Sequence, residues 1–221
     1  MMSKINLYLP EIKNGVRHSE DNIRRAIKNA EDFAFSKLDI NWDIDVFIKF
    51  EKNKNPEVRD RVSGHTYQSD FIALKVEDGF SDFEISEVLV HELCHAARWG
   101  KNPEYIKTLY DALIFEGLAV YFASEFIKDK ESRQDFMNII LSRSDEKNEK
   151  ILSGLKDQLE STNYDYDEIF GWNKKMPWAG YSLGHYLLKH YLTKANKKIK
   201  EIYVERYNTF QASLRLPLNM L

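Results

Sequence analysis

Residues 81–100 read SDFEISEVLVHELCHAARWG, and the rest of the chain is interpreted around this stretch. Ser81 and Glu84 have the spacing of a capping box, in which each side chain accepts a hydrogen bond from the other residue's backbone. Gly100, with Pro103 just beyond it, is typical of the end of a helix. The spacing therefore predicts one helix from Ser81 to about Gly100.

This helix carries a histidine pair with a glutamate beside it, at His91, Glu92 and His95. Histidines four residues apart project from the same helix face, so both rings can reach one metal ion. Glu92 lies one residue round the helix, where a carboxylate can take a proton from water activated by that metal. The alternative is two surface histidines on an amphipathic helix. Apolar neighbours such as Leu89 and Ala96 favour a buried helix and hence a metal site, because unpartnered polar groups are costly there.

Glu116 is the best candidate for a third metal ligand. It is the only charged residue between Ala112 and Ala123, and an ionised carboxylate in such an apolar run needs a partner. Gly117 weakens the helix, which is tolerable if two backbones must approach closely there. The alternative is an ion pair between Glu116 and Arg98 or a lysine. Two weaker ligand candidates lie near the edges of the apolar run, Asp111 and Glu125.

Strands come first along the chain and helices afterwards, which favours an α+β fold. We expect strands at residues 5–10, 42–50 and 65–76 (one or two strands in the last range), with a helix capped at Ser19 between the first two and a charged loop at 52–60 after the second. Later helices are expected at residues 105–128, 131–141, 146–159, 180–192 and 197–210, with an aromatic loop at 164–178. We interpret residues 1–221 as a single domain with lobes at about 1–100 and 101–221 and a hinge near 100–104.

The composition excludes several classes of protein. The 221 residues include 32 Lys and Arg against 35 Asp and Glu, and a net charge of −3 gives no reason to expect a nucleic-acid partner. Apolar runs are too short for a membrane span. Cys94 is the only cysteine, so an internal disulfide is impossible, and we interpret it as a small buried thiol. Because the first residues do not resemble a signal peptide, we expect a cytoplasmic protein.

The motifs around His91 and Glu116 also resemble those of a known family. His91-Glu92-x-x-His95, with Glu116 after twenty intervening residues, resembles the gluzincin metallopeptidases of the thermolysin type. Glu116-Gly117-Leu118-Ala119 is similar to the Glu-Gly-Phe-Ala signature of their aminopeptidase branch. Three segments more closely resemble a small bacterial family of predicted zinc-dependent proteases: HELCHAARW at 91–99, TLYDALIFEGLA at 108–119 and AGYSLG at 179–184.

The resemblance implies a zincin-like fold, in which a short twisted sheet packs on the helix that carries His91 and His95 and a helical lobe closes the cleft. It implies one zinc ion per chain and hydrolysis of a peptide or protein substrate. It also implies that Tyr181 donates a hydrogen bond to the tetrahedral intermediate, a task that suits a phenol near a metal. His185, four residues on, is the second candidate. Ordinary packing is the alternative for both residues.

The chain departs from the wider pattern in two places. Val120 stands where thermolysin-type enzymes carry an aspartate that supports a histidine, so that support must come from elsewhere, such as Asp111, Arg98 or a backbone carbonyl. The Gly-x-Met-Glu-Asn segment that holds a free amino terminus in aminopeptidases is missing. The strand in its place, residues 63–74, can still bind a peptide by edge pairing, with His65, Thr66 and Tyr67 near the cleft, which suits an endopeptidase.

Three readings of function remain open. The first is a zinc metallopeptidase with Glu92 as general base and Tyr181 as donor to the oxyanion. The second is a catalytically silent zinc-binding sensor or partner-binding module. The third is hydrolysis of something other than a protein, as one aminopeptidase relative does with an epoxide. Ligand types favour zinc but do not exclude manganese or cobalt. The aromatic loop is expected either to line the substrate site or to pack in the core.

Overall fold

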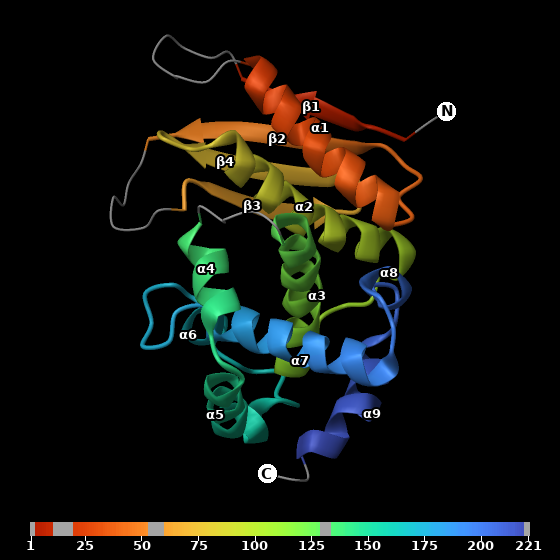
Figure 1. Cartoon of the computed structure of the whole chain (residues 1–221), viewed down its shortest axis with the longest axis vertical. Helices are drawn as coiled ribbons and strands as arrows, with labels where there is room; N and C mark the ends of the chain where they lie inside the picture. Colours follow the sequence, from red (N-terminus) through yellow and green to blue (C-terminus); the bar gives the residue numbers. More distant parts are fainter. Residues whose placement is uncertain (1–2, 11–19, 53–59, 129–133, 219–221) are drawn as a thin grey trace. The chain divides into compact units, whose positions relative to one another are not determined.

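The computed structural model describes residues 3–10, 20–52, 60–128 and 134–218. The described residues of 1–101 and 125–135 form one compact unit, and those of 102–124 and 136–221 form another. The first unit contains the sheet and two long helices, and the second is helical (Figure 1). The α+β class expected from the sequence is therefore confirmed. No helix within the described ranges has the length and apolarity that a membrane span requires.

The first unit is built on a mixed four-stranded sheet. Its strands are β1 (Ile5–Tyr8), β2 (Ile44–Glu51), β3 (Val62–Gln68) and β4 (Phe71–Glu77), in the order β1-β2-β4-β3. Strands β1, β2 and β4 run parallel, and β3 pairs antiparallel with β4. The region expected to hold one or two strands at 65–76 thus forms a hairpin of two. Because β3 is at the end of this order, none of the strands in the described ranges pairs with its outer edge.

One face of this sheet is buried beneath α1 (Glu20–Lys37) and α2 (Asp82–Lys101), which also pack on each other (Figure 1). Alternate residues of the central strands supply the apolar layer, as period-2 patterning requires. These residues are Ile44, Val46 and Ile48 of β2 and Ile72, Leu74 and Val76 of β4. Helix α2 contacts β3 and β4 directly, so the sheet fixes the helix that carries the histidine pair.

The capping box at the start of α2 is confirmed. The Ser81 backbone N–H donates to Oε2 of Glu84 at 2.7 Å, and the Glu84 N–H donates to Oγ of Ser81 at 3.3 Å. The other predicted cap, Ser19, lies outside the described residues, as do residues 53–59 of the predicted loop and 131–133 of a predicted helix.

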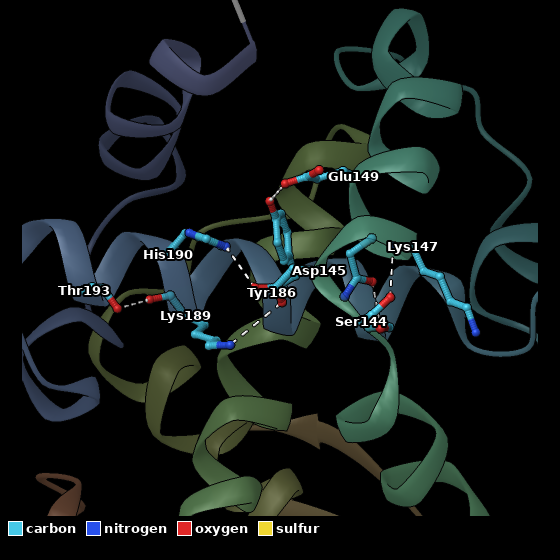
Figure 2. Close-up of polar contacts among 10 residues, drawn as sticks. Ser144, Asp145, Lys147, Glu149, Tyr186, Lys189, His190 and Thr193 are labelled. Carbon is cyan, nitrogen blue, oxygen red and sulfur yellow. Dashed lines mark hydrogen bonds and ion pairs between the residues drawn. The ribbon is translucent and has the colours of Figure 1, made fainter. Parts of the chain in front are cut away.

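The second unit contains most of α3 (Leu109–Ile127) and α4 (Asp135–Ser142). It also contains α5 (Asp145–Leu155), the 3₁₀ turn η1 (Lys156–Gln158), α6 (Tyr166–Phe170), α7 (Ala179–Ala195), α8 (Ile199–Ile202) and α9 (Tyr207–Leu218). Helix α7 packs against α5, α6 and α9. Buried Ser182 donates to Oδ1 of buried Asn148 at 2.9 Å, and Tyr186 donates to Glu149 at 3.2 Å, so polar contacts tie α5 to α7 (Figure 2 shows the second).

Three features of this unit differ from the prediction. Helix α3 begins at Leu109 and not at 105, because Thr108 and Asp111 form a capping box there: the Asp111 N–H donates to Oγ1 of Thr108, and the Asp111 carboxylate accepts the N–H groups of Lys107 and Thr108. The aromatic loop contains the short helix α6, which Asp165 caps by accepting the Glu168 N–H at 3.0 Å. The helix predicted at 197–210 is broken between α8 and α9.

Helices α3 and α7 touch through two glycines. A Cβ on Gly117 would lie 2.5 Å from the carbonyl carbon and oxygen of Gly184, and a Cβ on Gly184 would lie 2.2 Å from the Leu113 oxygen. Since real Cβ atoms do not approach backbone so closely, both residues must be glycine for this crossing to form. The close backbone approach expected at Gly117 is confirmed.

This crossing predicts opposite outcomes for two glycine-to-alanine changes. Gly117→Ala should lower the free energy of unfolding by about 1–3 kcal/mol, because overpacking outweighs the gain of about 1 kcal/mol in helix propensity. Gly154→Ala is the matched control: it lies in α5 with nothing within 4 Å of its Cβ position. It should raise the same free energy by up to about 1 kcal/mol. Urea denaturation measures both, and a stabilising Gly117→Ala would contradict the crossing.

Candidate metal and catalytic site

Within the first unit, His91 and His95 point their rings at the same place. Their Nε2 atoms are 3.1 Å apart, and the rings meet edge to face with centroids 4.8 Å apart. His95 is buried and His91 is half-buried. Two nitrogens bound to one tetrahedral zinc at about 2.0–2.1 Å lie about 3.3 Å from each other. The observed separation therefore fits two ligands of a single ion.

Glu92 is buried on the side of α2 that meets the edge strand β3. Thr66 Oγ1 donates to its carboxylate Oε2 at 2.7 Å. The two neighbours of Thr66, His65 and Tyr67, are exposed. Their rings pack edge to face with centroids 4.5 Å apart. Of the three β3 residues expected near the site, the structure thus brings only Thr66 against the candidate base.

Within the second unit, Glu116 lies in a group with two tyrosines. Tyr166 donates to Oε1 of Glu116 at 3.4 Å, and its hydroxyl is also 3.4 Å from that of Tyr181. The Gly117–Gly184 crossing accounts for this grouping, because Glu116 precedes one glycine and Tyr181 lies one helical turn before the other. Tyr181 packs edge-on against Phe136 and Phe170.

Tyr166 belongs to the aromatic loop that the sequence predicts either to line the substrate site or to pack in the core. The structure instead places it at the start of helix α6, and its contact with Glu116 is not predicted by the sequence. Burial and the charge of Glu116 raise the pKa of the Tyr166 phenol above its ordinary value. The phenol therefore keeps its proton at neutral pH and acts as a hydrogen-bond donor. The sequence signal for helix α6 is Asp165, which stands three residues before Glu168, the spacing of a helix cap.

The alternative residues have other contacts. Asp111 caps α3, as described above, and Glu125 forms an ion pair with Lys37 at 3.7 Å. His185 stacks on Tyr121 with ring centroids 5.8 Å apart, and no described contact joins it to Tyr166 or Glu116. The described contacts therefore group Tyr181, and not His185, with Glu116. Cys94 is buried, as expected.

A helix with two histidines four residues apart and a glutamate directly after the first is typical of zinc-dependent proteases. The chain belongs to the family described as Predicted Zn-dependent protease (DUF2268), whose model matches residues 20–212. No curated protein and no solved structure matches it. The match establishes the family to which the chain belongs, and that family is described as predicted zinc-dependent proteases.

The pKa of His185 yields a test of its environment. Burial, with a smaller contribution from the charge of Lys189, lowers this pKa to about 4. The folded protein then binds the proton less tightly than the unfolded chain, whose histidine has a pKa of about 6.5. The stabilising contribution is therefore complete above about pH 6.5 and is lost as the pH falls toward about 4.

We expect the wild type to lose more unfolding free energy than His185→Gln between about pH 7 and pH 4.5, as measured by urea denaturation at each pH. Parallel losses in the two proteins would show that His185 takes up its proton equally well in the folded and unfolded states. That result would contradict the burial of its ring.

Proposed function

We propose that this chain is a zinc metallopeptidase of the gluzincin type with a zincin-like fold. His91, His95 and Glu116, a possible ligand set among the described residues, would hold one zinc ion. The observation that carries the proposal is the 3.1 Å separation of the two histidine Nε2 atoms. Two nitrogens and one carboxylate are a usual ligand set for catalytic zinc, which keeps its fourth position open.

The residues of each unit fit such an ion by their chemistry. Imidazole and carboxylate are ligands that zinc accepts, and a half-buried Glu116 gains from a cation partner. The chain passes from one unit to the other within α3, the helix that also carries Glu116. Zinc, when bound, supplies a Lewis acid that makes water acidic enough to ionise near neutral pH.

Glu92 is proposed as the general base. Its carboxylate takes the proton of the attacking water and later passes that proton to the nitrogen of the leaving amine. A buried position excludes bulk water that would otherwise compete for the carboxylate. The Thr66 hydroxyl donates a hydrogen bond to one oxygen of the Glu92 carboxylate, and the other oxygen is left for proton transfer.

Tyr181 is proposed to donate a hydrogen bond to the oxygen that becomes negative when the peptide carbonyl is attacked. Its hydroxyl lies 3.4 Å from the Tyr166 hydroxyl, whose single hydrogen can be donated either to Glu116 or to the Tyr181 oxygen. When Tyr166 donates to Tyr181, the Tyr181 hydrogen is left for the oxyanion, and because the Tyr166 phenol holds its proton this contact adds no negative charge.

The substrate proposed is a peptide or protein segment in extended form. Strand β3 ends the sheet next to Glu92, and an unpaired edge can bind an extended peptide through backbone hydrogen bonds. Such binding requires no free amino terminus, which favours cleavage within a chain. A cytoplasmic location and the absence of a nucleic-acid or membrane partner remain predictions from the sequence.

The alternative is a catalytically silent zinc-binding sensor or partner-binding module. A site without catalysis needs no base, yet Glu92 is buried beside the histidine pair and hydrogen-bonded to Thr66. Structural zinc sites also usually have four protein ligands. These observations favour the enzyme.

The test is Glu92→Gln. Purified wild type and variant are assayed for zinc content and for cleavage of a peptide panel, alongside small amide and epoxide substrates. We expect about one zinc per chain in both proteins, and a loss of at least about 10²-fold in peptide turnover in the variant, because the amide cannot take a proton.

Glu149→Gln is the matched control, since this exposed α5 carboxylate contacts Tyr186 and has no proposed role. It should keep wild-type turnover. Full activity in Glu92→Gln would contradict the mechanism. A zinc-loaded wild type that cleaves nothing would favour the silent module.

A further inference from the structure

Two residues of strand β3, Gly64 and Thr66, lie directly against the side chain of Glu92, all within the first unit. Thr66 is 4% exposed and Glu92 is 6% exposed, so water does not compete at this contact. Thr66 Oγ1 lies 2.7 Å from Oε2 of the carboxylate and 3.0 Å from the Glu92 backbone oxygen. A hydroxyl has a single hydrogen, which the shorter distance assigns to the carboxylate.

Gly64 leaves the space that the Glu92 side chain fills. A Cβ at residue 64 would lie 2.5 Å from Cγ of Glu92 and 2.8 Å from Oε1. Glycine weakens a strand interior, and its presence there marks a close approach by another group. The carboxylate of Glu92 is thus bounded by Gly64 on one side and hydrogen-bonded by Thr66 on the other.

The hairpin is irregular next to Thr66. Thr66 pairs with Ile72, and the next pair joins Gln68 to Phe71, so Tyr67 is an extra residue in the strand. Such a bulge changes the direction in which neighbouring side chains project. Tyr67 is 55% exposed, whereas Thr66 points inward to Glu92.

We infer that Thr66 is a positioning residue for the general base, and that Gly64 provides the space for it: together they hold the Glu92 carboxylate in one orientation. The role of the base rests on the proposed function, while the contact itself does not. A carboxylate can rotate about its last bond, and fixing one oxygen presents the other in a constant direction. A base displaced by about 1 Å can lose about 10²-fold in rate.

Kinetics of Thr66→Val, Thr66→Ser and Gly64→Ala test the inference. Valine has the shape of threonine but cannot donate, and we expect kcat to fall about 10- to 100-fold with KM and zinc content unchanged. Thr66→Ser keeps the hydroxyl and should recover most of the lost kcat. Gly64→Ala should lower kcat in the same way, whereas Ser63→Ala, at an exposed neighbouring position, should not.

Thermal unfolding of the zinc-free proteins tests the contact without any assay of activity. The set is wild type, Thr66→Val, Glu92→Gln and the double variant. Thr66→Val should lower the Tm of the wild type by about 5 °C, because a buried carboxylate oxygen loses its donor, and should lower that of Glu92→Gln by clearly less.

The two readouts separate the inference from the proposed function. Additive Tm changes, or a zinc-loaded Thr66→Val with wild-type kcat, would overturn the positioning role. A wild type that hydrolyses no substrate would overturn the proposed function alone, and the Tm values would still decide whether Thr66 holds Glu92.

Discussion

The burial of α2 against the sheet and α1 is the constraint on which the rest of the structure depends. This helix buries five residues with acidic or basic side chains, and each needs a partner because an isolated buried charge is costly. They are Glu84, Glu87, Glu92, His95 and Arg98. Glu84 is satisfied at the helix start, where it accepts from the backbone of Ser81, and Glu92 is satisfied by Thr66. The sheet that buries α2 thus also supplies the contact that orients the proposed base.

Glycines permit close contacts around the candidate residues of each unit. Gly64 makes room for Glu92, and the Gly117–Gly184 contact brings Glu116 and Tyr181 into one group. In each case a methyl group would occupy the space that the functional side chain or the facing helix needs. Glycine lowers local stability in strands and helices, so backbone propensity does not explain its presence here. The close approach of a neighbouring side chain or helix does.

The sequence predicts what local patterns control. The Ser81–Glu84 cap, the apolar faces of the strands and the spacing of His91 and His95 all follow from periodicity within a few residues. Glu116 could be selected because a lone carboxylate in an apolar run needs a partner. The α+β class follows from the order of these elements.

What the sequence could not predict depends on contacts between distant residues. Thr66 meets Glu92 across 26 positions and Tyr166 meets Glu116 across 50, and no periodic pattern encodes either contact. The misplaced start of α3 has a different cause, because the contact there is local: Asp111, considered above as a metal ligand, belongs to the cap of this helix. Apolar periodicity continued through the break between α8 and α9, so that break was missed as well.

The most direct test of the central claim is the zinc affinity of the purified, untagged protein, measured by competition with a chromophoric chelator. His95→Ala and Glu116→Gln are compared with Glu125→Gln, a carboxylate of the same helix that pairs with Lys37. We expect about one zinc per chain for the wild type and Glu125→Gln, with binding lost or at least about tenfold weaker in the other two. No binding by the wild type, or unchanged binding by Glu116→Gln, would contradict the central claim.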